Sequence, residues 1–276
     1  MANTAKSFRA AMIQFTAARE PAPNVETLAG MIGAAHDGGA DLILLPENAN
    51  WLEPDSKRAR AQAVDEAADP LLAQCRTLAR DRGVWILLGS IAVLAGDKRA
   101  NRSLLVDDRG EIAARYDKIH MFDVDIGDGQ VYRESAVIEP GDRAVIAETP
   151  WGKVGLTVCY DLRFPHLYRA LAQGGANILT VPAAFTRKTG EAHWHTLLRA
   201  RAIENGAFVL APCQCGTHAE GRETFGHSLA VDPWGKVIAD GGPGPGVVYA
   251  DIDMARVGAV RAMIPSLDHD RPFEKP

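Results

Sequence analysis

Short apolar runs alternate with longer amphipathic stretches through most of the chain. The runs have the length, and the flanking glycine or polar residues, that are typical of buried strands. They lie at residues 9–15, 42–45, 84–88 and 154–158. Helix signals lie between them, since Asn24 can cap one helix that Gly38 ends and the pair Asp69-Pro70 opens another. This alternation predicts a layered α/β fold.

The second half of the chain repeats the pattern of the first. The sequence GGADLILLP at residues 38–46 matches GGANILTVP at residues 174–182. Two further matches follow in the same order, one of them a hairpin signal. They pair residues 82–88 with 205–211, and residues 103–110 with 228–235. We expect two similar α/β halves packed together, although matches of this kind can also arise by chance between unrelated strands.

The two halves differ at positions that carry chemistry. After the shared proline, the first half has Glu47 where the second has Ala183. Past the shared hairpin, the first half has Lys118 where the second has a glycine- and proline-rich loop at residues 241–246. A third group, Cys159, follows a predicted core strand. Because ligands bind at the carboxyl ends of strands in open α/β folds, we expect these three side chains to share a site.

The chemistry of the three side chains is complementary. A thiol with an ordinary pKa of about 8.5 needs a base or a nearby cation to become a nucleophile. Glu47 can supply the base, and the ammonium of Lys118 can stabilise a developing oxyanion. Each residue also has a plain alternative: a buried structural cysteine, a surface carboxylate or a solvated lysine. Histidines in polar loops offer a competing Cys–His arrangement, namely His120, His193, His195 and His227.

Charge and cysteine content exclude several classes of function. A net charge of −5 provides no basic surface for nucleic acid and no polybasic patch for membranes. The first seven residues lack the apolar region of a secretory signal, and no apolar stretch approaches the 18 or so residues that span a bilayer. Four cysteines do not resemble a disulfide framework, so we expect a cytoplasmic protein. Cys213 and Cys215 are expected to be buried packing rather than a metal site.

The segments around the three residues resemble the glutamate, lysine and cysteine motifs of the nitrilase superfamily of carbon–nitrogen hydrolases. They are LPEN at residues 45–48, YDKIH at 116–120 and GLTVCYD at 155–161. Glu134, in YRES, matches the auxiliary glutamate of the family. The resemblance implies a four-layer α-β-β-α sandwich, with two sheets face to face and pseudo-symmetric halves. It implies a single domain over residues 8–276, with a C-terminal tail from about residue 265.

The resemblance also implies a mechanism. Glu47 would act as general base, Cys159 as the nucleophile that forms a thioester, and Glu134 as a positioning residue. Lys118 and the backbone N–H of Tyr160 would stabilise the oxyanion. No metal and no organic cofactor is required. Members of the family form homodimers or higher even oligomers, and the tail would reach toward the partner, although a frayed terminus fits its composition equally well.

The sequence CYDLRF that begins at Cys159 looks like the Nit-type amidases, closer to deaminated glutathione amidases than to ω-amidases. The implied substrate is a small amide that carries α-keto and carboxylate groups, with α-ketoglutaramate as the ω-amidase alternative. Arg163 is a candidate for binding the substrate carboxylate, and its alternative is an ion pair with Asp161 or Glu204. Further candidates for the pocket lining are Phe185, Thr189, His193 and Trp194, the last of which could equally be core.

Residues 123–131 and 217–223 are predicted to be pocket-lining loops that decide the substrate. Two interpretations from other classes remain, a non-catalytic binding relative and a thiol redox protein. The intact set of catalytic candidates argues against the first. The absence of a C-X-X-C pair argues against the second.

Overall fold

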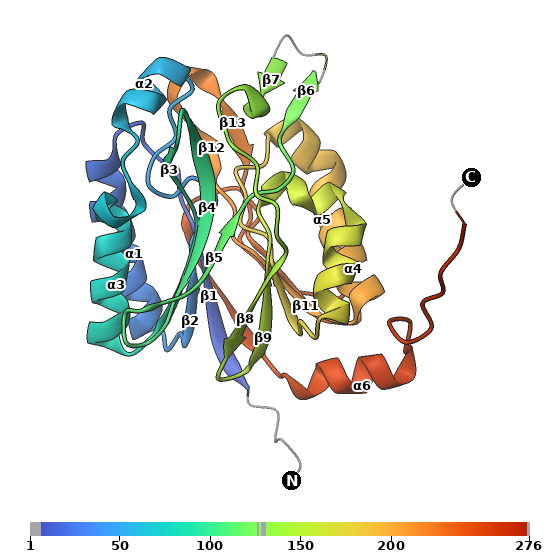
Figure 1. Cartoon of the computed structure of the whole chain (residues 1–276). Helices are drawn as coiled ribbons and strands as arrows, with labels where there is room; N and C mark the ends of the chain where they lie inside the picture. The colour runs from blue at the N-terminus through green and yellow to red at the C-terminus, as the bar shows by residue number, and fades with distance from the viewer. Residues whose placement is uncertain (1–6, 126, 128–130, 275–276) are drawn as a thin grey trace.

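Two six-stranded sheets lie face to face, and helices cover their outer surfaces (Figure 1). This is the α-β-β-α sandwich that the resemblance to the nitrilase superfamily implies. The computed structural model describes residues 7–125, 127 and 131–274. The first six residues, for which we expect no secretory signal, therefore lie outside the described part of the chain.

The first sheet has the strand order β16-β1-β2-β3-β4-β5. Its strands are β1 (Phe8–Gln14), β2 (Leu42–Leu44), β3 (Trp85–Ala95), β4 (Lys98–Val106), β5 (Ile112–Asp117) and β16 (Gly246–Ile252). The helices α1 (Pro21–Asp37) and α3 (Pro70–Arg82) cover its outer face. Strands β1, β2 and β3 are parallel to one another, and the remaining neighbours are antiparallel.

The second sheet has the order β15-β14-β11-β10-β9-β8. Its strands are β8 (Val145–Thr149), β9 (Gly152–Leu156), β10 (Ile178–Thr180), β11 (Phe208–Ala211), β14 (Leu229–Val231) and β15 (Val237–Asp240). The helices α4 (Pro165–Gln173) and α5 (Arg187–Asn205) cover it. Again three parallel strands, β9, β10 and β11, are followed by an antiparallel pair.

The two sheets therefore share one topology, and the sequence repeat marks equivalent strands. The first pair of repeated segments contains β2 and β10, and the second contains the start of β3 and the whole of β11. The third contains the end of β4 and the whole of β14, each with the turn that leads into β5 or β15. The prediction of two similar halves is confirmed. Smaller elements lie between these strands: α2 (Ser56–Gln62), the pair β6 (Asp123–Asp125) and β7 (Val131–Arg133), and the pair β12 (Cys215–Thr217) and β13 (Glu223–Phe225).

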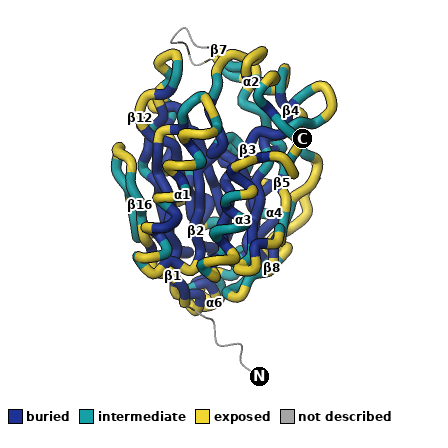
Figure 2. The backbone as a smooth tube through the Cα atoms, turned by 90° about the vertical axis from the view of Figure 1, so that its left-hand side faces the viewer, coloured by how far each residue is buried: buried dark blue, intermediate teal, exposed yellow. Residues whose placement is uncertain are grey.

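The apolar core forms in layers because successive side chains of a strand point to opposite faces. In β1, Ala10 and Met12 join the cluster between the sheets, whereas Ala11 and Ile13 pack against the residues beneath α1 and α3. Figure 2, seen from the side of these helices, shows the buried backbone concentrated in the strands. The triad candidates lie at one end of this core.

Helix ends follow the predicted signals with one exception. The Asp69 side chain accepts a hydrogen bond from Leu72 N at 2.9 Å and caps α3, which begins at Pro70. The first helix, however, begins at Pro21 rather than at Asn24. Proline suits the first turn of a helix, and the buried amide of Asn24 instead binds the N–H and the carbonyl of Ala18 in the preceding loop.

The C-terminal segment follows α6 (Ala255–Met263) and packs on α4 before it leaves the body of the molecule (Figure 1). Arg169 of α4 donates to the carbonyl of Ser266 at 2.6 Å, and Gln173 donates to Asp270 at 2.7 Å. No helix in the described part of the chain is long and apolar enough to span a membrane.

Candidate active site

Glu47, Lys118 and Cys159 meet at the carboxyl ends of strands from both sheets. Glu47 lies in the loop after β2, Lys118 directly follows β5, and Cys159 begins a short 3-10 turn (Cys159–Arg163) after β9. Lys118 Nζ lies 3.1 Å from Glu47 Oε1, and the Cys159 thiol lies close enough to the Glu47 carboxylate for each group to shift the pKa of the other. Their exposed fractions are 3%, 2% and 8%. The structure therefore brings the three predicted residues into one buried cluster.

The Glu47 carboxylate is held at both oxygens. Asn101 Nδ2 donates to Oε1 at 2.9 Å, and the backbone N–H of Ala184 donates to Oε2 at 2.8 Å. The amide of Gln214 donates to the Glu47 carbonyl at 3.0 Å. None of these three partners was predicted from the sequence. The alternation along β4 could have indicated Asn101, but Ala184 and Gln214 come from the other sheet and only the packing of the halves reveals them.

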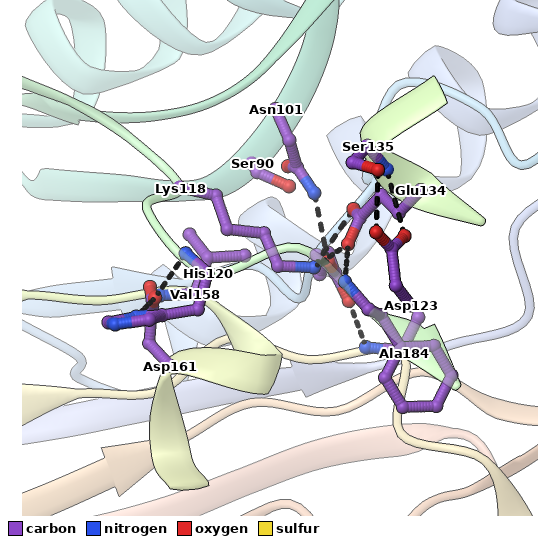
Figure 3. Close-up of polar contacts among 12 residues, drawn as sticks. Ser90, Asn101, Lys118, His120, Asp123, Glu134, Ser135, Val158, Asp161 and Ala184 are labelled. Carbon is purple, nitrogen blue, oxygen red and sulfur yellow. Dashed lines mark hydrogen bonds and ion pairs between the residues drawn. The ribbon is translucent and has the colours of Figure 1, made fainter. Parts of the chain in front are cut away.

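Glu134 orients the lysine. Its carboxylate oxygens lie 2.9 and 2.8 Å from Lys118 Nζ, and one of them also accepts from the backbone N–H of Phe122 at 2.6 Å. Figure 3 shows Glu134 directed at Lys118, with Ser135 beside it bonded to Asp123. The auxiliary glutamate thus contacts the predicted triad as the resemblance implies.

The turn that carries Cys159 is built around a buried carboxylate. Cys159 has φ 48°, a left-handed conformation that is uncommon for a residue with a side chain. The Asp161 carboxylate accepts hydrogen bonds from Val158 N at 2.8 Å and from Tyr116 Oη at 2.7 Å. It also accepts from the backbone N–H and the ring Nδ1 of His120. Asp161 therefore ties the nucleophile turn to the segment that carries Lys118 and His120 (Figure 3).

The electrostatics keep one carboxylate charged beside a neutral thiol. Burial raises the pKa of Glu47, but the Lys118 charge and the hydrogen bonds from Cys159 and Ala184 outweigh it, so the net pKa is lowered. Burial lowers the pKa of Lys118, and the carboxylates of Glu134 and Glu47 raise it more, so the ammonium stays charged. Burial and the Glu47 charge raise the pKa of the Cys159 thiol.

A cavity of about 280 Å³ opens above this cluster. Aromatic and basic side chains line much of it: Trp51, Phe122, Tyr132, Tyr160, Phe185, Arg99, Arg133 and Arg222. Two of the residues predicted to line the pocket, Phe185 and Thr189, do line this cavity. Arg222 and Val131 come from the two loops expected to line the pocket, although residues 126 and 128–130 of the first loop lie outside the described residues.

Three predicted pocket residues lie elsewhere. Trp194 is fully buried and donates to the carbonyl of His227 at 2.8 Å, so it belongs to the core. His193 lies on the exposed face of α5, with Nδ1 3.2 Å from Arg163 Nη2. The Arg163 guanidinium stacks behind the cavity on the rings of Tyr160 and Phe185.

Arg163 forms neither of the two ion pairs considered from the sequence, with Asp161 or with Glu204. The Asp161 carboxylate is used by Tyr116, Val158 and His120, as described above, and Glu204 pairs with Arg201 at 2.9 Å. Arg163 instead supports two aromatic rings that do line the cavity. Because Arg163 is not among the residues that line the cavity, its position does not support the predicted contact with the substrate carboxylate.

The remaining titratable clusters lie apart from the cavity lining. His195 and His227 both bind the Asp240 carboxylate, at 3.0 and 2.9 Å, and form the one grouping among the described residues with the spacing of a metal site. Cys213 and Cys215 are free, buried thiols, as predicted for packing residues. Burial raises the pKa of Cys213 to about 12, which keeps it unreactive.

Comparison with known proteins agrees with this site. The carbon-nitrogen hydrolase family matches residues 9–262. A relative from Yersinia enterocolitica, named deaminated glutathione amidase, is 43% identical over 271 residues, which cover 96% of this chain and 94% of the relative. The Caenorhabditis elegans NitFhit protein has a similar structure, with a TM-score of 0.90 and 34% identity over 96% of this chain but only 65% of its own.

A second solved structure relates the chain to the nitrilase superfamily as a whole. Nit3 of Saccharomyces cerevisiae, described as a member of branch 10 of the nitrilase superfamily, matches with a TM-score of 0.84 and 27% identity. This match covers 94% of this chain and 95% of Nit3. The chain therefore belongs to the carbon-nitrogen hydrolase family of the nitrilase superfamily, as a hydrolase that acts on amide bonds.

Proposed function

We propose that the protein is a deaminated glutathione amidase that works through a thioester on Cys159. The contact of a buried carboxylate, a buried ammonium and a strained cysteine at the floor of one cavity is the observation that carries the chemistry. The substrate rests on the curated relative, which is named for this activity and matches over nearly its full length.

The first step is attack on the amide carbonyl. Because Glu47 is ionised and Cys159 is a neutral thiol beside it, the carboxylate accepts the proton as the sulfur–carbon bond forms. The oxyanion forms near the Lys118 ammonium. The N–H of Tyr160, early in the 3-10 turn and without an intrahelical acceptor, is the second donor.

The second step expels the amine and the third releases the acid. Glu47 returns its proton to the amine nitrogen as the carbon–nitrogen bond breaks, which leaves a thioester on Cys159. Glu47 then takes a proton from water, the hydroxide adds to the thioester carbonyl, and the thiol leaves with that proton. Glu134 holds Lys118 in place throughout, with two oxygens within 2.9 Å of Nζ.

Turnover of two substrates tests this assignment. Release of the amine from deaminated glutathione and of ammonia from α-ketoglutaramate is measured side by side. A clear kcat/KM preference for deaminated glutathione is expected, and a preference for α-ketoglutaramate would make the protein an ω-amidase instead. Cys159→Ala should abolish turnover while the protein stays folded, and Glu47→Gln should lose about 10²–10⁴-fold. Activity near the wild-type level in either variant would contradict the catalytic roles.

We also propose that the protein forms a homodimer or a higher even oligomer in a reducing compartment such as the cytoplasm. Large apolar side chains are exposed near the C-terminal ends of α5 and α6: Ile203, Met263 and Ile264 are 52%, 56% and 55% exposed. Burying such groups favours association. Light scattering during gel filtration tests the oligomer, and a monomeric mass at micromolar concentration would contradict it.

A further inference from the structure

One buried arginine at the cavity has no acidic partner among the residues that the structure describes. Arg99 on β4 lines the cavity and is only 7% exposed. Its guanidinium lies 5.5 Å from the centre of the Trp51 ring, and among the described residues its side chain makes no hydrogen bond or ion pair. Arginine is rarely buried unless it is paired, because an uncompensated charge in the interior is costly. Arg201, of similar burial, is paired with Glu204.

The strand direction orients Arg99 toward the catalytic centre. Alternate residues of a strand share a face, and Asn101, two residues on, donates to the general base Glu47. Arg102 lies on the opposite face and pairs with Asp117 and Glu66 at 2.7 and 2.9 Å. Burial and the charge of Arg60 lower the pKa of Arg99, and the Glu134 charge opposes them, so a nearby anion would stabilise the guanidinium.

We propose that Arg99 binds a carboxylate of the substrate, away from the scissile amide, and so selects amides that carry one. The inference deepens the function proposed above, because deaminated glutathione has a carboxylate at each end. A guanidinium fork matches a carboxylate in a bidentate pair. A neutral substrate leaves Arg99 buried and unpaired, so the site discriminates by charge rather than by size.

Two other arginines near the site have different surroundings. Arg222 lines the cavity but already donates to the carbonyl of Ala184 at 3.1 Å and lies over the Tyr132 ring, although its buried Nε has no partner among the described residues. Arg163 lies behind the cavity wall. Arg99 is therefore the primary carboxylate site, and Arg222 serves as its matched comparison.

Matched substrates measure the selection directly. Glutaramate is compared with pentanamide, in which a methyl group replaces the carboxylate, and deaminated glutathione with its C-terminal glycinamide. The ratio of kcat/KM for the acid to that for its neutral partner is the readout. Arg99→Met should lower this ratio at least about tenfold, the lower end of what a charged hydrogen bond contributes, chiefly because kcat/KM for the acids falls. Arg99→Lys should be intermediate, because it keeps the charge but loses the fork.

The two substrate pairs also locate the carboxylate. A fall confined to deaminated glutathione against its glycinamide assigns Arg99 to the leaving-group end, and a fall for glutaramate assigns it to the acyl end. An equal loss for acids and neutral amides would mean that Arg99 only packs on Trp51, and would overturn the proposal. An unchanged ratio, or a ratio that falls only in Arg222→Met, would overturn it as well.

Binding separates this proposal from the proposed function. Glutarate and deaminated glutathione are each titrated calorimetrically into Cys159→Ala, with and without Arg99→Met, so that both carboxylate positions are probed and no turnover is needed. Weaker binding in the double variant supports the carboxylate site even if the wild type does not hydrolyse deaminated glutathione. Equal affinity of the two proteins for both ligands refutes the site, and the half-buried neighbour Lys98→Met, which should bind both ligands normally, controls for general effects of charge.

Discussion

Replacing Asp161 by asparagine should separate the nucleophile turn from the lysine strand. The Asp161 carboxylate is fully buried and accepts four hydrogen bonds. One oxygen receives Tyr116 Oη and Val158 N, and the other receives the backbone N–H and Nδ1 of His120. Asparagine has the same shape but only one acceptor oxygen, so its amide group must face one of these two pairs of donors.

The cost follows from this count. The Tyr116 hydroxyl or the His120 ring can change its role and accept from the new amide, but the backbone N–H beside it cannot. Either orientation therefore leaves one buried N–H unpaired, which costs about 1–3 kcal/mol. The two bonds that remain lose their charged acceptor, at about 1 kcal/mol each. We expect Asp161→Asn to lower the free energy of unfolding by about 3–5 kcal/mol.

Urea denaturation followed by tryptophan fluorescence measures this loss, with the m-value checked against the wild type. The kcat should also fall, because the turn and the strand carry Cys159 and Lys118. Asp253→Asn is the control, since its exposed side chain accepts a single bond from Ala255 N and should change stability by no more than about 0.5 kcal/mol. A loss below about 1 kcal/mol for Asp161→Asn would show that the donors find other partners.

Three further outcomes are expected. Burial lowers the pKa of His218 to about 4, so between pH 4 and the unfolded-state pKa of about 6.5 only the unfolded state binds the proton. The free energy of unfolding should therefore fall by about 3 kcal/mol as the pH drops through this window. In urea titrations at several pH values, His218→Gln should flatten this dependence. Burial raises the pKa of Glu47, but the Lys118 charge lowers it more, so Glu47 should stay ionised below its ordinary pKa of about 4.3. We therefore expect kcat/KM to stay constant as the pH falls and to decline only below about pH 4.3. An acid limb centred near pH 6 would contradict an ionised base. A Cβ at Gly89 would overlap the carbonyl oxygen of Leu45, so Gly89→Ala should destabilise the protein by more than about 2 kcal/mol in the same urea assay, and a neutral result would show that the strand can shift.

The sequence by itself determined the elements and the repeat. Apolar runs placed β1, β2 and β9 to within two residues, because strand periodicity and turn residues act locally. The repeat showed which strands are equivalent, and its two mismatches pointed to Glu47 and Lys118. Both mismatches and Cys159 follow strands, and parallel strands expose their carboxyl ends at the same edge, so their meeting could be foreseen.

Only the tertiary structure decided which side chains surround them. Trp194 and Arg163 lie close in sequence to residues of the cavity, yet the rotation of α5 buries one and the 3-10 turn carries the other behind two aromatic rings. Ala184 and Gln214 reach Glu47 only because the two sheets stack face to face. Arg99 looks like any surface arginine in the sequence. That none of the described residues pairs with its side chain follows from the packing of β4 against distant segments, which no local pattern encodes.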